Sequence, residues 1–218
     1  MQEPLKLGVL ISGRGSNLKA LIDASLGPIF PAEIITVISN EPEAKGLEYA
    51  TKAGISTKVI PHRDFIDRTS FEAELDREFR AADVELIALA GFMRLLTKEF
   101  VTTWKNRLVN IHPSLLPAFK GLNTHKRAIE AGVLFSGCTV HFVRPIMDEG
   151  PIIAQAAIPI HPSDNPQSLA ARVLKIEHLL YPHAIRLIAE GKIRIKDDRV
   201  IIKGTGIPIP GQIINPSF

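Results

Sequence analysis

The sequence predicts an α/β domain built on a mostly parallel sheet with helices on both faces. Short apolar runs alternate along the chain with stretches of helical apolar spacing, which is the pattern of βαβ units. A glycine loop follows the first apolar run directly. Right-handed crossovers would then place helices on both faces of the sheet. Because no linker interrupts this pattern, we expect one domain over residues 1–218.

The first half of the chain carries the clearest alternation. The run LKLGVLIS at residues 5–12 is apolar almost throughout, as in a strand that is buried on both faces. Phe71, Leu75 and Phe79 fall on one stripe of an amphipathic helix. We expect strands at residues 5–12, 33–39, 56–61, 86–91 and 107–112, and helices at 18–26, 43–54, 70–82 and 97–105.

The rhythm changes after Pro117. One long helix is predicted over residues 165–190, with Pro166 at its first position and Gly191 just past its end. From Lys192 onward we expect strand and loop, lying at the surface where Pro208, Pro210 and Gly211 occur. Upstream of the long helix we expect a helix at 124–132 and strands at 136–143 and 151–160, joined by the loop RPIMDEG.

Composition restricts the classes of function. The chain is 45% apolar and 22% charged, which is ordinary for a globular protein. The single cysteine, Cys138, fits a reducing compartment, so we expect a cytoplasmic protein. The net charge of +3 is spread along the chain, which suits small anionic substrates and disfavours nucleic acid. No apolar run approaches the roughly 18–20 residues that span a bilayer, and the N-terminus lacks a signal-peptide pattern.

The segment LISGRGSNL predicts a phosphate-binding loop. Gly13 and Gly15 allow backbone N–H groups to approach an anion, while Ser16 and Asn17 can cap the following helix and offer donors. A dinucleotide is disfavoured, because the fingerprint G-x-G-x-x-G needs glycine where Leu18 stands, and the second predicted strand ends without an acid for a ribose. A tight turn without a ligand is the alternative.

A second candidate site follows the fifth predicted strand. Asn110 and His112 are two residues apart, so both side chains point to one side of an extended strand, at the edge where open α/β sheets bind ligands. A histidine beside a turn is more often simply solvated. Asp148, in the loop RPIMDEG, would normally be a surface charge. If the fold brings Asp148 to His112, its carboxylate stabilises the imidazolium and raises the pKa of the histidine.

Other features are weaker indications. The segment from Gly91 to Arg94 could form the wall of an apolar ligand slot, although a methionine among leucines is more often core. The remaining histidines have no metal-ligand spacing, so we expect no metal. Ser114 lacks the G-x-S-x-G setting of a serine nucleophile.

Five motifs together resemble one family. ISGRGSNL, LAGFMRLL, NIHPSLLPAFKG, TVHFV and MDEGPII are similar, in order and spacing, to the glycinamide ribonucleotide (phosphoribosylglycinamide) formyltransferases of purine biosynthesis, from about Leu5 to Glu190. The resemblance implies a single formyltransferase domain with a Rossmann-like, mostly parallel seven-stranded sheet. It implies a nucleotide-binding half at about 1–105, a folate-binding and catalytic part at about 106–190 and a tail at 191–218.

The resemblance also implies an activity and a set of site residues. The reaction would move a formyl group from 10-formyltetrahydrofolate, as co-substrate, to the amine of N1-(5-phospho-D-ribosyl)glycinamide, in a monomer or homodimer. Asn123 and Glu149 depart from the family's usual histidine and glycine. The implied catalytic residues are Asn110, His112 and Asp148; the nucleotide-binding residues are Gly15, Ser16, Asn17, Leu18, Lys19, Pro113 and Glu177; the folate-binding residues are Arg68, Met93, Arg94, Leu95, Leu96, Asn110, Arg144, Ile146 and Met147.

Four other functions compete with this one. Methionyl-tRNA formyltransferase shares the SLLP turn, but we expect it to need a further basic domain beyond Phe218. Formyltetrahydrofolate hydrolase is expected to carry a regulatory domain before Leu5. A nucleotide-dependent oxidoreductase conflicts with the glycine pattern. A ligand sensor without catalysis would not need Asn110, His112 and Asp148 together.

Overall fold

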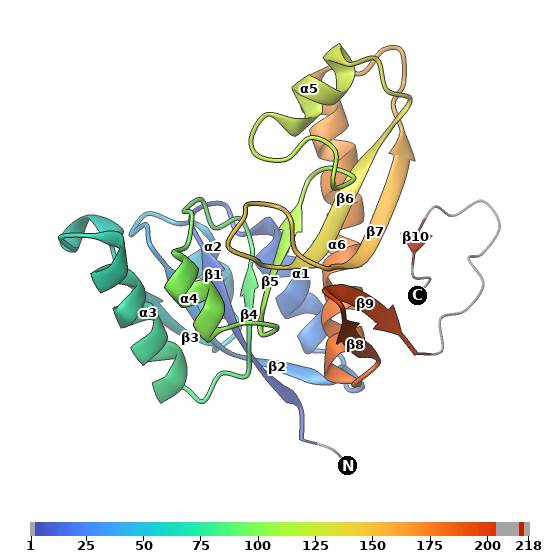
Figure 1. Cartoon of the computed structure of the whole chain (residues 1–218). Helices are drawn as coiled ribbons and strands as arrows, with labels where there is room; N and C mark the ends of the chain where they lie inside the picture. Colours follow the sequence, from blue (N-terminus) through green and yellow to red (C-terminus); the bar gives the residue numbers. More distant parts are fainter. Residues whose placement is uncertain (1–2, 204–213, 216–218) are drawn as a thin grey trace. The chain divides into compact units, whose positions relative to one another are not determined.

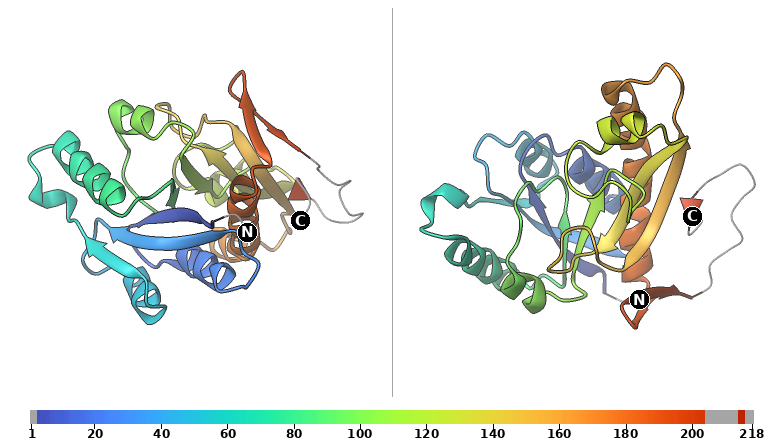
Figure 2. Two further views of the ribbon diagram at one scale, coloured as in Figure 1. Left: turned by 90° about the horizontal axis from the view of Figure 1, so that it is seen from below. Right: turned by 45° about the horizontal axis from the view of Figure 1, so that its top comes forward.

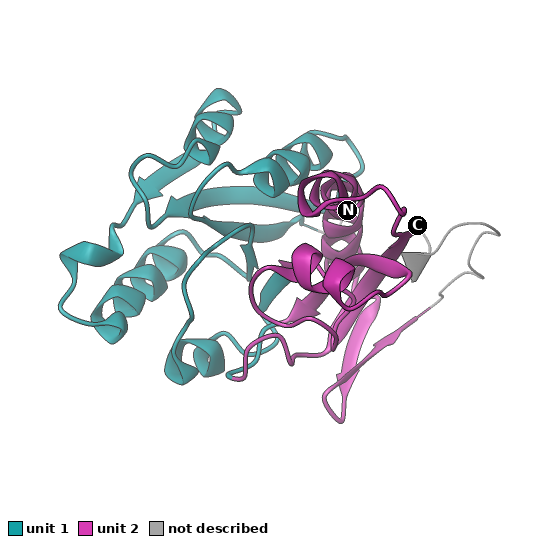
Figure 3. Cartoon of the chain, turned by 90° about the horizontal axis from the view of Figure 1, so that it is seen from above, with its two compact units in different colours: residues 1–110, 143–145 teal, residues 111–142, 146–218 magenta. Residues whose placement is uncertain are grey.

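The computed structural model describes residues 3–203 and 214–215. The chain divides into two compact units, coloured separately in Figure 3. Unit 1 contains residues 1–110 and 143–145, and unit 2 contains residues 111–142 and 146–218. The boundary falls within one strand, after Asn110. Pro208, Pro210 and Gly211, which were predicted to lie at the surface, are outside the described residues.

Unit 1 is organised around parallel strands, labelled in Figure 1. Their order is β5-β4-β1-β2-β3, and each described pair within the unit is parallel. The first strand, β1, is buried from Leu7 to Ile11, as its apolar run predicts. The strands are β1 (Leu5–Ile11), β2 (Ala32–Ser39), β3 (Ser56–Val59), β4 (Leu86–Leu89) and β5 (Leu108–His112).

Helices cover both faces of this parallel sheet, which explains why its strands are apolar on both sides. Figure 2 (left) shows α1 and α2 on one face, and α3 and α4 on the other. Right-handed βαβ connections produce this arrangement, so the prediction of helices on both faces is confirmed for unit 1. The helices are α1 (Ser16–Ser25), α2 (Gly46–Lys52), α3 (Arg68–Ala81) and α4 (Lys98–Thr103), with a short 3₁₀ turn, η1, at His62–Asp64.

The core on the α3 face is aromatic. Phe71, Leu75 and Phe79 form the predicted stripe and are buried against the sheet. Gly8 of β1 makes room for Phe79, because a Cβ at position 8 would lie 2.7 Å from the ring. Trp104 packs edge-on against Phe79 with ring centroids 6.0 Å apart. Burying each of these side chains contributes about 1.5–3 kcal/mol, so this cluster fixes the sheet that carries the loops described below.

Element boundaries differ from the predicted ones by a few residues. The helix predicted from residue 70 begins at Arg68, because Asp67 and Ser70 form a capping box in which the Asp67 side chain accepts the Ser70 N–H at 2.7 Å. The helix predicted from residue 43 begins only at Gly46.

Unit 2 combines antiparallel strands with the long helix α6. Its described strands pair as β6 with β7 and β7 with β10, and α6 packs against β6 and β7. Asn165 caps α6 by accepting the N–H groups of Gln167 and Ser168, and the helix continues through Pro182. Its predicted extent and start are confirmed. The elements are α5 (Thr124–Glu130), β6 (Phe135–Phe142), β7 (Ile152–Pro159), α6 (Pro166–Ala189), β8 (Ile193–Lys196), β9 (Arg199–Ile202) and β10 (Ile214–Asn215).

The start of the C-terminal tail is a hairpin. β8 pairs antiparallel with β9, and Asp197 and Asp198 between them have φ of 50° and 55°. Two successive residues with positive φ make the tight turn that matches the twist of the flanking strands. The expectation of strand and loop after Lys192 holds for this hairpin.

Candidate functional site

The glycine loop of unit 1 lies between β1 and α1 and packs directly against the start of α2. Gly15 has φ of 71°, and a Cβ placed on it would lie 2.4 Å from the Gly46 Cα. The Gly46 N–H donates to the Gly13 carbonyl at 3.0 Å. Gly15 is therefore required twice, for its left-handed backbone and for the close approach of a second backbone. This contact holds the loop in one conformation at the N-terminus of α1.

The start of α1 differs from the prediction in one respect. Ser16 and Asn17 were expected to cap the helix, but Ser16 is its first residue and Gly15 occupies the cap position, where no side-chain hydrogen bond is made. The cap prediction is wrong because the helix begins at Ser16, two residues before its predicted start at residue 18. A helix N-terminus without a side-chain cap is a favourable position for an anion.

The other predicted nucleotide-loop residues have different surroundings. The Leu18 side chain is fully buried, so only its backbone is available to a ligand. Lys19 forms an ion pair with Asp23, with Nζ and Oδ2 2.5 Å apart. Since both side chains are more than half exposed, a phosphate could displace this pair at little cost.

The segment after β4 in unit 1 exposes apolar side chains. Met93 and Leu95 are 67% and 58% exposed, whereas Leu96 packs against the aromatic core. Arg94 is exposed, as is Arg68 at the start of α3. An exposed Met and Leu beside arginine suit a ligand with an apolar ring and an acidic tail, and the core alternative proposed for Met93 does not apply.

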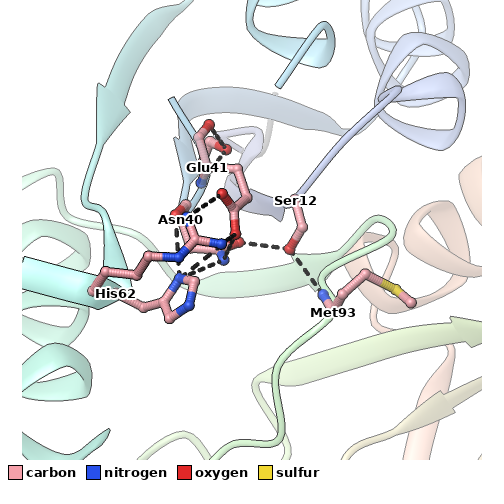
Figure 4. Close-up of polar contacts among 7 residues, drawn as sticks. Ser12, Asn40, Glu41, His62 and Met93 are labelled. Carbon is pink, nitrogen blue, oxygen red and sulfur yellow. Dashed lines mark hydrogen bonds and ion pairs between the residues drawn. The ribbon is translucent and has the colours of Figure 1, made fainter. Parts of the chain in front are cut away.

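Polar side chains gather where the strands of unit 1 end (Figure 4). Asn40 follows β2 and its Nδ2 lies 3.0 Å from His62 Nδ1. The next residue, Glu41, binds Arg63 through both oxygens at 2.9 and 3.2 Å. The acid nearest the end of β2 is thus paired with an arginine.

In unit 2, the structure brings His112 and Asp148 together. His112 Nδ1 lies 3.5 Å from Asp148 Oδ2, and both side chains are 8% exposed. The Asp148 carboxylate is therefore a buried partner of the histidine, and the alternative that it is a solvated surface charge is wrong. On its other side, His112 Nε2 lies 3.1 Å from the Phe119 carbonyl. Oxygen atoms of Asp148 and Phe119 therefore face both ring nitrogens of His112.

Further groups fix Asp148 in place. Its backbone has φ of 56°, and its Oδ2 accepts the Gly121 N–H at 2.8 Å. His141 Nε2 lies 3.9 Å from the other oxygen, Oδ1. Burial lowers the pKa of His141, an effect that the nearby Asp148 charge opposes. His141 is thus a neutral neighbour of the Asp148 carboxylate at neutral pH.

A third histidine, His125, lies near this pair at the start of α5. Burial lowers its pKa, and the charge of His112 lowers it further. His125 is therefore neutral at neutral pH and does not compete with His112 for the charge of Asp148.

The remaining predicted residues are distributed over both units. Asn110 and His112 lie on β5 two residues apart, so their side chains leave the strand on one side. In unit 1, Arg144 donates to Asn106 Oδ1 at 2.8 Å. In unit 2, Glu177 of α6 is buried, and its charge adds to burial in raising the pKa of the Cys138 thiol. Pro113 follows β5 directly, and Ile146 and Met147 are 63% and 47% exposed.

Comparison with known proteins assigns the family. Residues 5–185 match the model of the formyl transferase family. The chain belongs to this family.

Relatives of this formyl transferase differ in length. This chain is 50% identical over 199 residues to the trifunctional purine biosynthetic protein adenosine-3 of Drosophila melanogaster. The match covers 90% of this chain and only 15% of that protein. The chain is 41% identical over 206 residues to the phosphoribosylglycinamide formyltransferase of Haemophilus influenzae, covering 94% of this chain and 97% of that one. The resemblance drawn from the five motifs is confirmed.

A solved structure supports the fold class. The glycinamide ribonucleotide transformylase 1 of Symbiobacterium toebii matches with a TM-score of 0.90 and 45% identity, covering 93% of this chain and 95% of that one. The predicted class, a mostly parallel sheet with helices, is confirmed. The single-domain organisation stays a prediction.

The two residues that depart from the family pattern, Asn123 and Glu149, both lie in unit 2 of this formyl transferase. Asn123 has φ of 57° and holds the N-cap position of α5, where asparagine is tolerated in the left-handed region. Glu149 forms an ion pair with Lys120, with Oε1 and Nζ 2.5 Å apart. Together with the bond from Gly121 to Asp148, this pair ties the loop after β5 to the loop after β6.

Two residues near these sites do not stand out in the sequence. His141 lacks metal-ligand spacing, although its position in TVHFV, just before the loop that carries Asp148, could have indicated it. Ser12 lies inside LISGRGSNL, where the glycines are the evident feature, and no sequence signal identifies its partners. The partners of Ser12 are Asn40 and Met93, which lie 28 and 81 residues away in the sequence.

Two further features are absent from the described part of the chain. Over residues 3–203, no group of three or more His, Cys, Asp or Glu side chains is placed to hold a metal ion. Within the same range, no helix has the length and apolar character that crossing a membrane requires.

Proposed function

We propose that this chain transfers the formyl group of 10-formyltetrahydrofolate to the amine of N1-(5-phospho-D-ribosyl)glycinamide, a step of purine (IMP) biosynthesis. The observation that carries the proposal is the buried pair of His112 and Asp148 in unit 2, in a chain of the formyl transferase family. The names of its full-length relatives and of its solved neighbours support the same substrates.

The chemistry needs no metal. The substrate amine attacks the formyl carbon, so a C–N bond forms and the carbonyl oxygen becomes an oxyanion. Asn110 donates a hydrogen bond to this oxygen, a contribution whose loss typically raises the barrier by about 2.7–4 kcal/mol. The bond from the carbon to folate N10 then breaks. One proton moves in total, from the attacking amine to N10.

His112, as an imidazolium, supplies the positive charge that the oxyanion needs and donates its Nε2 proton to N10, and the proton lost by the attacking amine then restores the imidazolium. Asp148 stabilises the imidazolium through the Nδ1 side of the ring, at 3.5 Å. Nε2 lies 3.1 Å from the Phe119 carbonyl, so the substrate would replace that carbonyl as the acceptor of the Nε2 proton before transfer. General acid catalysis of this kind is worth roughly 10²–10⁴-fold in rate.

Substrate binding is assigned to separate segments. The phosphate would lie at the glycine loop and the start of α1, with contributions from Gly15, Ser16, Asn17, Leu18 and Lys19. Pro113 and Glu177 would contact the glycinamide end. The folate would contact the exposed apolar side chains after β4 and in the loop before Asp148, with residues Arg68, Met93, Arg94, Leu95, Leu96, Arg144, Ile146 and Met147. The protein would act in the cytoplasm, as a monomer or homodimer.

The test is an acceptor assay with matched histidine variants. Tetrahydrofolate release from 10-formyltetrahydrofolate should require the nucleotide, and release with water alone would identify a hydrolase instead. His112→Ala should lower kcat by about 10²–10⁴-fold while the nucleotide Kd changes little. His161→Ala, which truncates an exposed histidine of the same unit, is the control and should keep wild-type kcat. A wild-type kcat in His112→Ala would remove the catalytic assignment.

A further inference from the structure

One side chain of unit 1, Ser12, joins the loops that follow β1 and β4 (Figure 4). Its backbone N–H donates to the Gly91 carbonyl at 3.2 Å, which extends the pairing of the two strands. Beyond this ladder, the Met93 N–H donates to Ser12 Oγ at 2.8 Å. The serine hydroxyl thus binds a backbone group 81 residues further along the chain, at the point where the exposed apolar segment begins.

The orientation of this hydroxyl is fixed from a third strand end. Ser12 Oγ donates to Asn40 Oδ1 at 2.5 Å, so its hydrogen points to Asn40 and a lone pair remains for the Met93 N–H. Asn40 is itself 2% exposed, and its amide nitrogen lies 3.0 Å from His62 Nδ1. The hydroxyl therefore cannot rotate away from Met93 without breaking its part-buried hydrogen bond to Asn40.

The two segments joined by Ser12 are anchored independently at their other ends. The glycine loop is held by the bond from the Gly46 N–H to the Gly13 carbonyl, at 3.0 Å. The segment after Met93 ends at Thr97, whose N–H donates to the buried Glu72 carboxylate at 2.9 Å. Each segment thus has its own rigid support, and the Ser12 hydroxyl sets the position of one relative to the other.

We propose that Ser12 is a positioning residue that holds residues 93–96 in register with the glycine loop. The inference rests on the proposed function, in which the first segment contacts the folate and the second the phosphate. Ser12 touches neither substrate in this role. Its distinctive consequence is that removing a hydroxyl from the nucleotide loop weakens the binding of the other substrate.

The experiment compares Ser12→Ala with two matched variants. Ser12→Ala should raise the KM for 10-formyltetrahydrofolate by about fivefold, the effect of losing one hydrogen bond, with a smaller change in kcat. Ser12→Thr keeps the hydroxyl and should restore a KM near the wild-type value. Ser39→Ala is the control, because Ser39 is a serine at the end of the neighbouring strand β2 whose hydroxyl is hydrogen-bonded to Glu41 of its own turn.

A second measurement does not depend on turnover. Hydrogen–deuterium exchange of the peptide containing Met93 should become faster in Ser12→Ala and stay unchanged in Ser39→Ala. An unchanged folate KM together with unchanged exchange in Ser12→Ala, or equal effects in Ser39→Ala, would overturn the inference. Failure of the wild-type protein to turn over the two substrates would instead count against the proposed function, and the two failures are therefore distinguishable.

Discussion

Gly15→Ala tests the physical basis of the glycine loop. Gly15 has φ of 71°, a conformation that costs an L-residue about 1–2 kcal/mol. The new Cβ would also lie 2.4 Å from the Gly46 Cα, and it meets backbone, which cannot swing aside as a side chain can. Overpacking of this kind costs about 1–3 kcal/mol. We expect a total destabilisation of about 2–5 kcal/mol.

Thermal unfolding measures this effect directly. In a protein of this size, each kcal/mol lowers the midpoint by about 2–4 °C, so Gly15→Ala should unfold about 4–20 °C below wild type. If the loop binds phosphate as proposed, the KM for the nucleotide should rise as well, because the loop must move away from Gly46.

Two glycines of the same unit separate the two causes. Gly54 also has positive φ, 72°, but a Cβ added to it would meet no atom within 4 Å, so Gly54→Ala should lose only about 1–2 kcal/mol. Gly13 has open space and no positive φ, so Gly13→Ala should stay within about 0.5 kcal/mol of wild type in stability. A midpoint for Gly15→Ala no lower than that of Gly54→Ala would refute the close-contact argument.

Two further predictions concern other contacts. Gly137→Ala would place a Cβ 1.9 Å from the Ala156 carbonyl oxygen, so the unfolding midpoint should fall by about 2–12 °C, and an unchanged midpoint would contradict this close pairing of β6 with β7. Glu72 has a pKa raised by burial, against the hydrogen bonds from Thr97 that lower it. Its folded state therefore holds a proton more tightly than its unfolded state, and this stability is lost as pH rises above the usual value of 4.5. Glu72→Gln cannot titrate, so its unfolding midpoint relative to wild type should rise as the pH increases above 4.5, and parallel curves would exclude the effect.

Much of the fold follows from local patterns in the sequence. Apolar runs of strand length and helical apolar stripes depend only on residues that are close in the sequence. The order of the strands and helices was therefore predictable, and their boundaries were predictable to within a few residues. The caps of α3 and α6 show why the remaining errors are small: Asp67 and Asn165 each satisfy helix N–H groups within three residues of themselves.

Only the part of the candidate site that depends on neighbouring residues could be predicted from the sequence. Asn110 and His112 share one side of a strand because side chains alternate along it, and this is a property of the sequence alone. Whether Asp148 is a solvated charge or the buried partner of His112 depends on where the loop after β6 is held. That loop is held by Gly121 and His141, which are close to Asp148 only after folding.

The sequence by itself determined the alternation of strands and helices, the glycine loop and the pair on β5, since each is written in residues that are neighbours along the chain. Tertiary structure alone decided that Gly15 touches Gly46, that Ser12 reaches Met93 and that the Asp148 carboxylate is withdrawn from water. These contacts join segments distant in sequence, and their geometry is set by how the sheet, helices and loops pack, which no local pattern encodes.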